Sequence, residues 1–208
     1  MAQPGTRRPR RVLQGFAGGG GETFDYFHIN SIEVDHDSNL LVSSARNTFT
    51  VYKIDRSSGE LIWRLGGKKS NFEMDAGTRT RYQHDARRHS DGTISIFDNG
   101  GVFKDDISCG LIKILDMDEM TAILVRKHAQ PQGRVSATKG NMQVLLNGNA
   151  FIGWGSTPLF SELISDGELL FNASFPPKSN STGSTGRSVS HGAGSPATIQ
   201  PHGSRARL

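Results

Sequence analysis

The chain has 208 residues, a formal net charge of +4 and an apolar fraction of 35%. With its 25 glycines the composition falls in the range of folded soluble domains, which excludes a low-complexity chain. The single cysteine, Cys109, excludes an internal disulfide framework, and no stretch approaches the ~18 apolar residues of a membrane span. The N-terminal sequence MAQPGTRRPRR is charged and has no apolar core, so it lacks the pattern of a secretory signal.

The positive charge lies at the two ends of the chain. Residues 1–22 hold four arginines against one glutamate, and residues 176–208 hold four basic residues and no acid. Residues 23–175 hold 16 Lys and Arg against 19 Asp and Glu. A nucleic-acid groove needs basic residues interleaved with aromatics on the folded face, and the central segment has no such stripe. We therefore expect no nucleic-acid partner.

The ends also differ in composition from the centre. The segment GFAGGGGE is a glycine run, and the C-terminal segment is rich in Ser, Gly and Thr with few large apolar residues. Such segments bury too little apolar surface to offset the entropy of ordering them. The sequence predicts disorder over 1–22, a folded domain over 23–176 and a disordered tail over 177–208.

Short apolar segments of strand-forming residues follow one another along the folded part. They lie at 40–42, 50–54, 61–63, 93–97, 111–115, 122–125, 142–146, 150–152 and 169–171. Turn sequences such as Asp91-Gly92 and Asp166-Gly167 separate them. Helical periodicity is absent, so the sequence predicts an all-β protein.

The strands also recur as three units, at 41–63, 93–125 and 150–171. Their spacing of ~50–60 residues is near that of a kelch blade, and four short antiparallel strands per unit are typical of a β-propeller. Closed propellers need at least four blades, so we expect an open propeller with exposed sheet edges. Either the chain is a fragment of a longer protein, or it must assemble, with self-association through those edges.

Polar residues precede each unit at similar distances. His28 precedes the first unit, His84 the second and Asn141 the third. Equivalent positions of propeller blades face one central channel, so these side chains are expected to converge there. Each histidine could alternatively be structural and only form hydrogen bonds to its neighbours in the fold. The repetition of polar residues at equivalent positions, with Arg46 and Arg87 nearby in sequence, favours a functional site.

Several ordered strings of the chain resemble the arylsulfotransferase family, and its fungal branch in particular. They are DYFHINSI (25–32), LVSSAR (41–46), IWRLGG (62–67), YQHDAR (82–87), IFDN (96–99) and FIGWGS (151–156). The family folds as a six-bladed propeller and transfers sulfuryl groups between phenols without a nucleotide donor. The resemblance therefore implies an aryl sulfate and a phenol as small-molecule partners, with no cofactor and no metal.

The resemblance also implies roles for individual residues. The family's His-x-Asn pair falls on His28 and Asn30, its Ser-x-Arg arginine on Arg46, and its Gln-His element on Gln83-His84. In characterised members this last histidine is the nucleophile, which implies a sulfohistidine at His84. His28 and Arg46 would share in catalysis, and Asn30 and Arg46 would bind the substrate.

These residue types suit covalent catalysis. A neutral imidazole can attack the sulfur, and a second phenol can then attack the sulfohistidine. The planar guanidinium of Arg46 can donate two parallel hydrogen bonds to a sulfate, and His28 can act as a general acid. A non-enzymatic propeller that binds an anionic ligand or a protein partner, and an inactive fragment, are the alternatives.

Other residues are expected to be structural. Asp98-Asn99-Gly100 is typical of a turn that ends a strand rather than of a calcium site, and Trp63 and Trp154 of packing between blades. Cys109 has no close His or Lys and is expected to be inert.

Asn172 and Asn180 match the N-glycosylation pattern, which matters only in a secreted protein. An extracellular or secretory location is implied by the resemblance alone.

Overall fold

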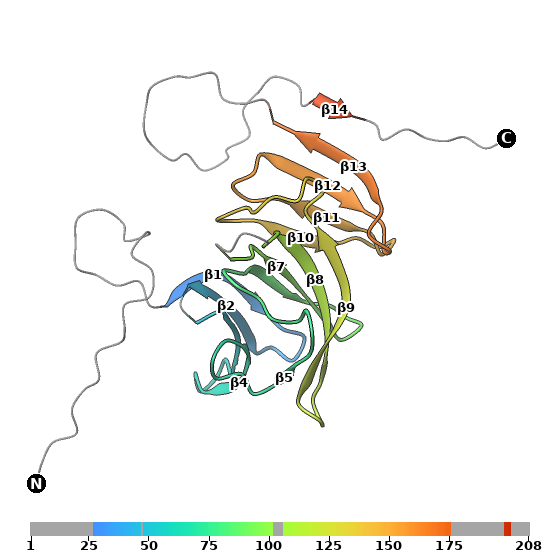
Figure 1. The fold of residues 1–208 in the computed structure, drawn as a ribbon. Coiled ribbons are helices and arrows are strands. Elements are labelled where there is room, and N and C mark those ends of the chain that lie inside the picture. The colour runs from blue at the N-terminus through green and yellow to red at the C-terminus, as the bar shows by residue number, and fades with distance from the viewer. Residues whose placement is uncertain (1–26, 47, 102–105, 176–197, 201–208) are drawn as a thin grey trace, which may run out of the picture.

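The structure of the protein, a computed structural model, describes residues 27–46, 48–101, 106–175 and 198–200 (Figure 1). Over these residues the chain forms strands and turns without helices, which confirms the prediction of an all-β protein. It follows that the described part contains no helix long and apolar enough to cross a membrane.

The strands form three sheets, which follow one another along the chain as propeller blades do (Figure 1). The first is antiparallel and comprises β1 (His28–Val34), β2 (Leu40–Arg46), β3 (Thr50–Ile54) and β4 (Leu61–Gly66). The second, in the order β5-β9-β8-β7-β6, comprises β5 (Glu73–Met74), β6 (His84–Arg88), β7 (Thr93–Asp98), β8 (Cys109–Asp116) and β9 (Thr121–Ala129). The third comprises β10 (Asn141–Val144), β11 (Ala150–Gly153), β12 (Leu159–Leu163), β13 (Leu169–Ser174) and β14 (Thr198–Gln200).

The two segments predicted to be disordered fall almost entirely outside the described residues. Residues 1–22 lie outside them, as does the tail 177–208 apart from β14. β14 pairs antiparallel with β13, so these three residues of the tail form a strand where the composition predicts disorder.

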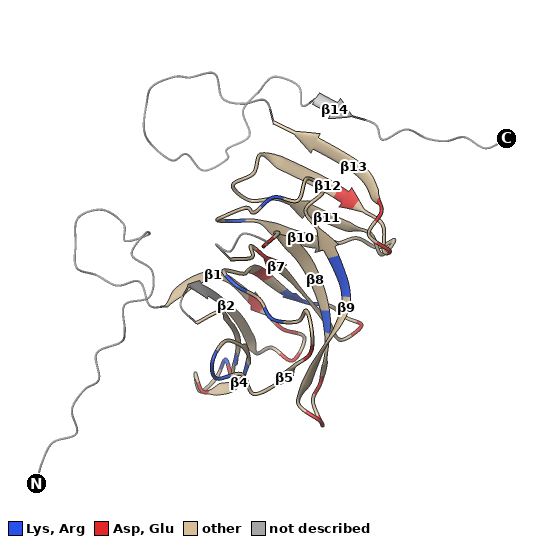
Figure 2. Cartoon of the chain, in the orientation of Figure 1, with Lys and Arg blue, Asp and Glu red and all other residues tan. Residues whose placement is uncertain are grey.

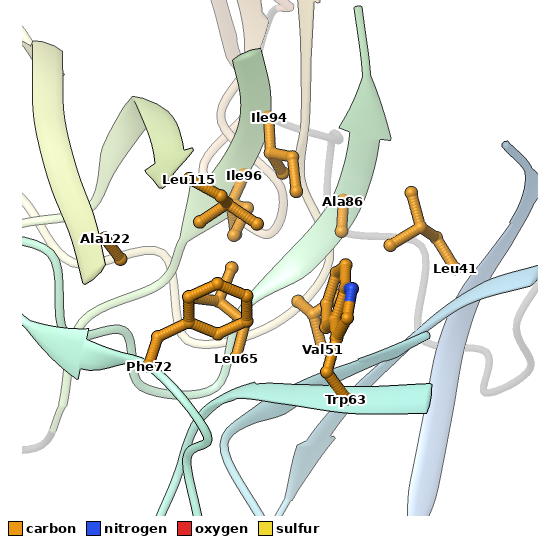
Figure 3. Close-up of a cluster of buried hydrophobic side chains, with 10 residues drawn as sticks. All are labelled: Leu41, Val51, Trp63, Leu65, Phe72, Ala86, Ile94, Ile96, Leu115 and Ala122. Carbon is orange, nitrogen blue, oxygen red and sulfur yellow. The ribbon is translucent and has the colours of Figure 1, made fainter. Parts of the chain in front are cut away.

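Two apolar cores fill the spaces between neighbouring sheets. The first joins the first and second sheets; its ten side chains, shown in Figure 3, are Leu41, Val51, Trp63, Leu65, Phe72, Ala86, Ile94, Ile96, Leu115 and Ala122. The second joins the second and third sheets and comprises Phe97, Ile112, Met142, Ala150, Ile152, Trp154, Leu159 and Leu163. The second sheet is therefore covered on both faces, which explains why almost every residue of β7 and β8 is buried.

Both tryptophans pack in these cores, as predicted. Trp63 lies edge-on to Phe72 with ring centroids 5.4 Å apart, and Trp154 contacts Phe97 at 5.9 Å. The indole N–H of Trp154 donates to the Ser161 hydroxyl at 2.8 Å, so the buried polar atom has a partner.

The innermost strands of the three sheets meet at one place. β6 forms an edge of the second sheet and contacts β1 and β2 of the first sheet and β10 of the third. Side chains of β1 satisfy backbone groups on the open edge of β6. The Ser31 hydroxyl accepts from the Ala86 N–H at 3.3 Å, and the Glu33 carboxylate accepts from the Arg88 N–H at 2.6 Å. This contact between blades positions the residues considered next.

Candidate active site

His84 lies at the start of β6 in an unusual backbone segment. Tyr82 before it and Asp85 after it have φ values of 54° and 53°, in the left-handed region that side chains other than glycine rarely adopt. The pairing of β6 with β7 is irregular between His84 and Arg87. Backbone strain of this kind persists only where the surrounding structure fixes it, and it is concentrated at functional sites.

The imidazole ring of His84 is held through one of its nitrogens. Nδ1 lies 2.9 Å from the carbonyl oxygen of Tyr82 and 2.7 Å from Oδ1 of Asn99. Asn99 follows β7 and is 1% exposed. Among the described residues the ring makes both of its hydrogen bonds through Nδ1, and Nε2 has no partner there.

The surroundings of His84 favour its neutral form. Burial lowers the pKa of the imidazole, the hydrogen bonds that its Nδ1 makes to the oxygens of Asn99 and Tyr82 oppose the shift, and the neighbouring His28 lowers the pKa further. Asp85 acts in the opposite direction, and the net shift is downward from 6.5. A neutral imidazole is the form that a nucleophilic histidine requires.

His28 and Asn30 are placed beside His84 by the contact of β1 with β6. His28 is close enough to influence the charge of His84. The amide nitrogen of Asn30 donates to the carbonyl oxygen of Gln83 at 2.6 Å, whereas its Oδ1 is buried and accepts no hydrogen bond from the described residues. Three of the four predicted site residues therefore lie together.

Arg46 is the fourth predicted site residue, and the structure describes the position of its backbone. It ends β2 directly opposite His28 in the register of the first sheet. Its side chain lies outside the described part of the structure.

Asp85 connects this site to the third sheet. Its Oδ2 accepts from the N–H of Met142 in β10 at 3.0 Å. Its Oδ1 accepts from Nε of Arg87 at 2.8 Å, so the guanidinium of Arg87 is already paired. Asn141, also singled out in the sequence, begins β10 opposite Gly153 and is exposed.

A cavity of about 260 Å³ opens beside the start of β10. Apolar side chains, among them Phe160 and Phe175, line most of it together with Asn141. His84 is not part of this lining.

The residues expected to be structural have structural partners. Oδ1 of Asp98 accepts from the N–H groups of Arg81 and Gly100 at 2.8 and 3.1 Å, which forms the predicted turn at the end of β7. Cys109 is buried, and burial raises the pKa of its thiol to about 12, so it is inert as predicted. Within the described part no group of three or more His, Cys, Asp and Glu side chains is placed to hold a metal ion.

The sequence predicts only a turn at Asn99, whereas the structure brings its side chain to His84. Asn99 ends the string IFDN, but its contact with residue 84 crosses from one strand to the next and has no local sequence pattern.

The two glycosylation sequons have different outcomes. Asn172 lies in β13, where its Oδ1 accepts from the Ser161 hydroxyl at 2.9 Å. Asn180 lies outside the described residues.

Comparison with known proteins connects these observations to a family. A solved structure of a protein of unknown function from Bacteroides caccae is similar with a TM-score of 0.48 and 15% identity, over 74% of this chain and 48% of that one. The chain thus spans about half the length of that protein, and no curated protein matches it. The family model described as arylsulfotransferase (ASST) matches residues 3–176, which include all six strings that resemble this family. The chain therefore belongs to the arylsulfotransferase family.

Proposed function

We propose that this protein transfers a sulfuryl group from an aryl sulfate to a phenol through a sulfohistidine at His84. The observation that carries the proposal is the state of the His84 ring. It is held at Nδ1, its pKa is lowered, and Nε2 has no hydrogen-bond partner among the described residues. Membership of the arylsulfotransferase family supports the reaction class.

In the first step, the lone pair of Nε2 attacks the sulfur of the donor. The bond between sulfur and the aryl oxygen breaks, and the phenolate leaves with its electron pair. In the second step, the oxygen of the acceptor phenol attacks the sulfur of the sulfohistidine. The S–N bond breaks and its electron pair returns to Nε2.

His28 is the proposed acid and base of this cycle. As an imidazolium it donates a proton to the departing phenolate, and as an imidazole it takes the proton of the acceptor phenol. Its position beside His84 supports this role. Balanced in this way, the two steps return both histidines to their starting states.

Arg46 and Asn30 are the proposed substrate ligands. Sulfuryl transfer resembles phosphoryl transfer, in which positioning and charge stabilisation provide most of the catalysis. The guanidinium of Arg46 suits the sulfuryl oxygens. The buried Oδ1 of Asn30 suits an O–H donor, because the amide nitrogen of the same side chain is already bonded to Gln83.

We also propose that blades of a second copy of this chain cover the two outer sheets. Ser31 and Glu33 of β1 face β6, so Ile32 and Val34 alternate to the opposite face, where they are 57% and 56% exposed. The third sheet carries a contiguous aromatic cluster, in which Phe160 contacts Phe151, Phe171 and Phe175. Unpartnered apolar surface of this kind is typical of an interface.

The test is the formation of the covalent intermediate. Purified chain is incubated with a chromogenic aryl sulfate, with and without a phenol acceptor, beside the variants His84→Ala and His36→Ala. His36 is an exposed histidine in a turn of the first sheet and serves as the matched control. We expect phenol release and one sulfuryl group on the peptide that contains residue 84, both lost only in His84→Ala. Folded wild-type protein without this adduct, or with the adduct on another residue, would overturn the proposal.

A further inference from the structure

We propose that Asn99 is a positioning residue that fixes the proton of His84 on Nδ1 and thereby leaves Nε2 as the reactive nitrogen. The catalytic consequence rests on the proposed function, whereas the position of the proton is measured without any turnover. Three features of the structure carry the inference.

The first feature is the orientation of the Asn99 amide. Its nitrogen lies 2.6 Å from the carbonyl oxygen of Ser136 and 2.8 Å from that of Lys139. A carbonyl oxygen only accepts hydrogen bonds, so the NH₂ group must face these two atoms. The remaining atom, Oδ1, must therefore face His84, and with the side chain 1% exposed no alternative orientation is solvated.

The second feature is the pair of acceptors at Nδ1 of His84. Both Oδ1 of Asn99 and the carbonyl oxygen of Tyr82 lie within hydrogen-bond distance of this nitrogen. An unprotonated Nδ1 would direct its lone pair at two oxygens, which is unfavourable in a partly buried site. Nδ1 therefore carries the hydrogen, and in a neutral ring Nε2 then carries the lone pair.

The third feature is the network that holds Asn99 itself. The hydroxyl of Ser108 donates to the carbonyl oxygen of Asn99 at 2.8 Å and accepts from the N–H of Ser136 at 2.7 Å. Ser136 and Lys139 lie in the segment that leads into β10. The third sheet thus contributes to the orientation of a nucleophile that the second sheet carries. The hydrogen-bond partners that orient metal-ligating histidines typically influence activity 10- to 100-fold, and we expect a similar effect for a partner that orients a nucleophilic histidine.

The decisive measurement is the nitrogen NMR spectrum of the protein labelled with ¹⁵N-histidine, with His84 assigned by its loss in His84→Ala. In wild-type protein at neutral pH we expect Nδ1 of His84 to have the chemical shift of a protonated ring nitrogen and Nε2 that of an unprotonated one. The opposite pattern in the wild-type protein would overturn the proposal, and this result requires no variant at position 99 to fold.

Two variants then test the cause. In Asn99→Leu the acceptor at Nδ1 is lost, and we expect a mixture of the two tautomers. Asn99→Gln retains both the acceptor and the donor of the amide and should restore the Nδ1–H form. Asn149→Leu is the matched control, because Asn149 is also buried but bonds Glu162 of the third sheet. An unchanged His84 spectrum in Asn99→Leu would assign the tautomer to Tyr82 alone and overturn the role of Asn99.

The catalytic consequence is measured separately. The rate of sulfuryl transfer should fall about 10- to 100-fold in Asn99→Leu and recover in part in Asn99→Gln. If Nδ1 carries the proton but no adduct forms on His84, the proposed function fails while the positioning role stands. If the adduct forms with equal rates in wild type and Asn99→Leu, the proposed function stands and the positioning role fails.

Discussion

The side-chain amide of Asn30 donates a 2.6 Å hydrogen bond to the carbonyl oxygen of Gln83, the residue directly before His84. The bond crosses from the first sheet to the second and is one of several by which β1 satisfies the open edge of β6. His84, the proposed nucleophile, is therefore held from two sides. Asn30 of the first sheet bonds Gln83 directly before it, and Asn99 bonds both its ring and the segment that leads into the third sheet.

The hydrogen bond from Asn30 predicts that replacing its NH₂ group by an oxygen destabilises the folded protein. In Asn30→Asp a carboxylate oxygen would face the Gln83 carbonyl oxygen, and we expect a loss of about 1–3 kcal/mol in the free energy of unfolding. Asn39→Asp is the control, because Oδ1 of Asn39 accepts from the N–H of Arg56 in an exposed turn and an aspartate can do the same. Urea unfolding of both variants measures the difference, and equal destabilisation would contradict the prediction.

The lowered pKa of His84 predicts that its reactivity persists in mild acid. Burial is the main cause, with His28 in the same direction and the Asn99, Tyr82 and Asp85 interactions against it. The folded pKa lies below 6.5, so the neutral, nucleophilic form should remain dominant at pH values where an ordinary histidine is half protonated. The rate of acylation of His84 by diethyl pyrocarbonate, followed by mass spectrometry against pH, measures this. A midpoint at or above that of a peptide containing residues 80–88 would show the prediction to be wrong.

The same shift has a consequence for stability. Between the folded pKa and 6.5 the unfolded chain binds more protons at this histidine than the folded chain does. The contribution of His84 to stability is therefore present at neutral pH and is lost as the pH falls through this window. The difference in unfolding free energy between wild type and His84→Gln should change over this pH range and be constant above it.

Prediction from sequence was most successful where strands are buried between sheets. The apolar runs at 93–97 and 111–115 fall in β7 and β8, which are covered on both faces. The two strands that build the candidate site, β1 with HINSIEV and β6 with HDARR, have no such pattern. Their polar side chains bond the neighbouring strand or face the site, so hydrophobic periodicity does not detect them. They were found from their places before each unit and from the family resemblance.

The role of Asn99 shows a second limit. The local pattern correctly predicts a turn, because Oδ1 of Asp98 accepts from the N–H of Gly100. The partners of the Asn99 side chain are 15, 37 and 40 residues away in the chain. Contacts of this range depend on how the second and third sheets pack, and a single sequence does not encode them in any short spacing.

Lys113 provides a prediction on stability that is independent of the candidate site. Its side chain is fully buried in β8, and its Nζ has no hydrogen-bond partner among the described residues. Burial lowers its pKa from 10.5 to about 8, against the opposing attraction of Asp98. Below pH 8 this shift destabilises the fold by about 3 kcal/mol, since each pKa unit corresponds to ~1.4 kcal/mol.

Lys113→Met should therefore increase the free energy of unfolding at pH 7 by up to about 3 kcal/mol. Because the folded protein releases this proton at about pH 8 and the unfolded chain only near 10.5, the advantage of the variant should decline as the pH rises across that interval. Denaturant titrations at a series of pH values test this. Lys127→Met is the control, because Lys127 is exposed and belongs to the basic segment of β9, which is blue in Figure 2. A Lys113→Met protein less stable than wild type at pH 7 would mean that the ammonium has a partner in solution.

The exposed apolar residues of the outer sheets predict that copies of the chain associate. One charged side chain introduced on such a face should weaken this association. Ile32 is 57% exposed on the face of the first sheet that points away from β6. If this face is an interface, Ile32→Glu would bury an unpaired carboxylate there, and the apparent dissociation constant should rise at least tenfold. Leu146→Glu is the matched control, because Leu146 is fully exposed in the turn between β10 and β11. Sedimentation velocity over a range of concentrations measures both variants beside the wild type. A wild-type chain that is monomeric throughout, or equal dissociation constants for wild type and Ile32→Glu, would exclude a second copy on this face.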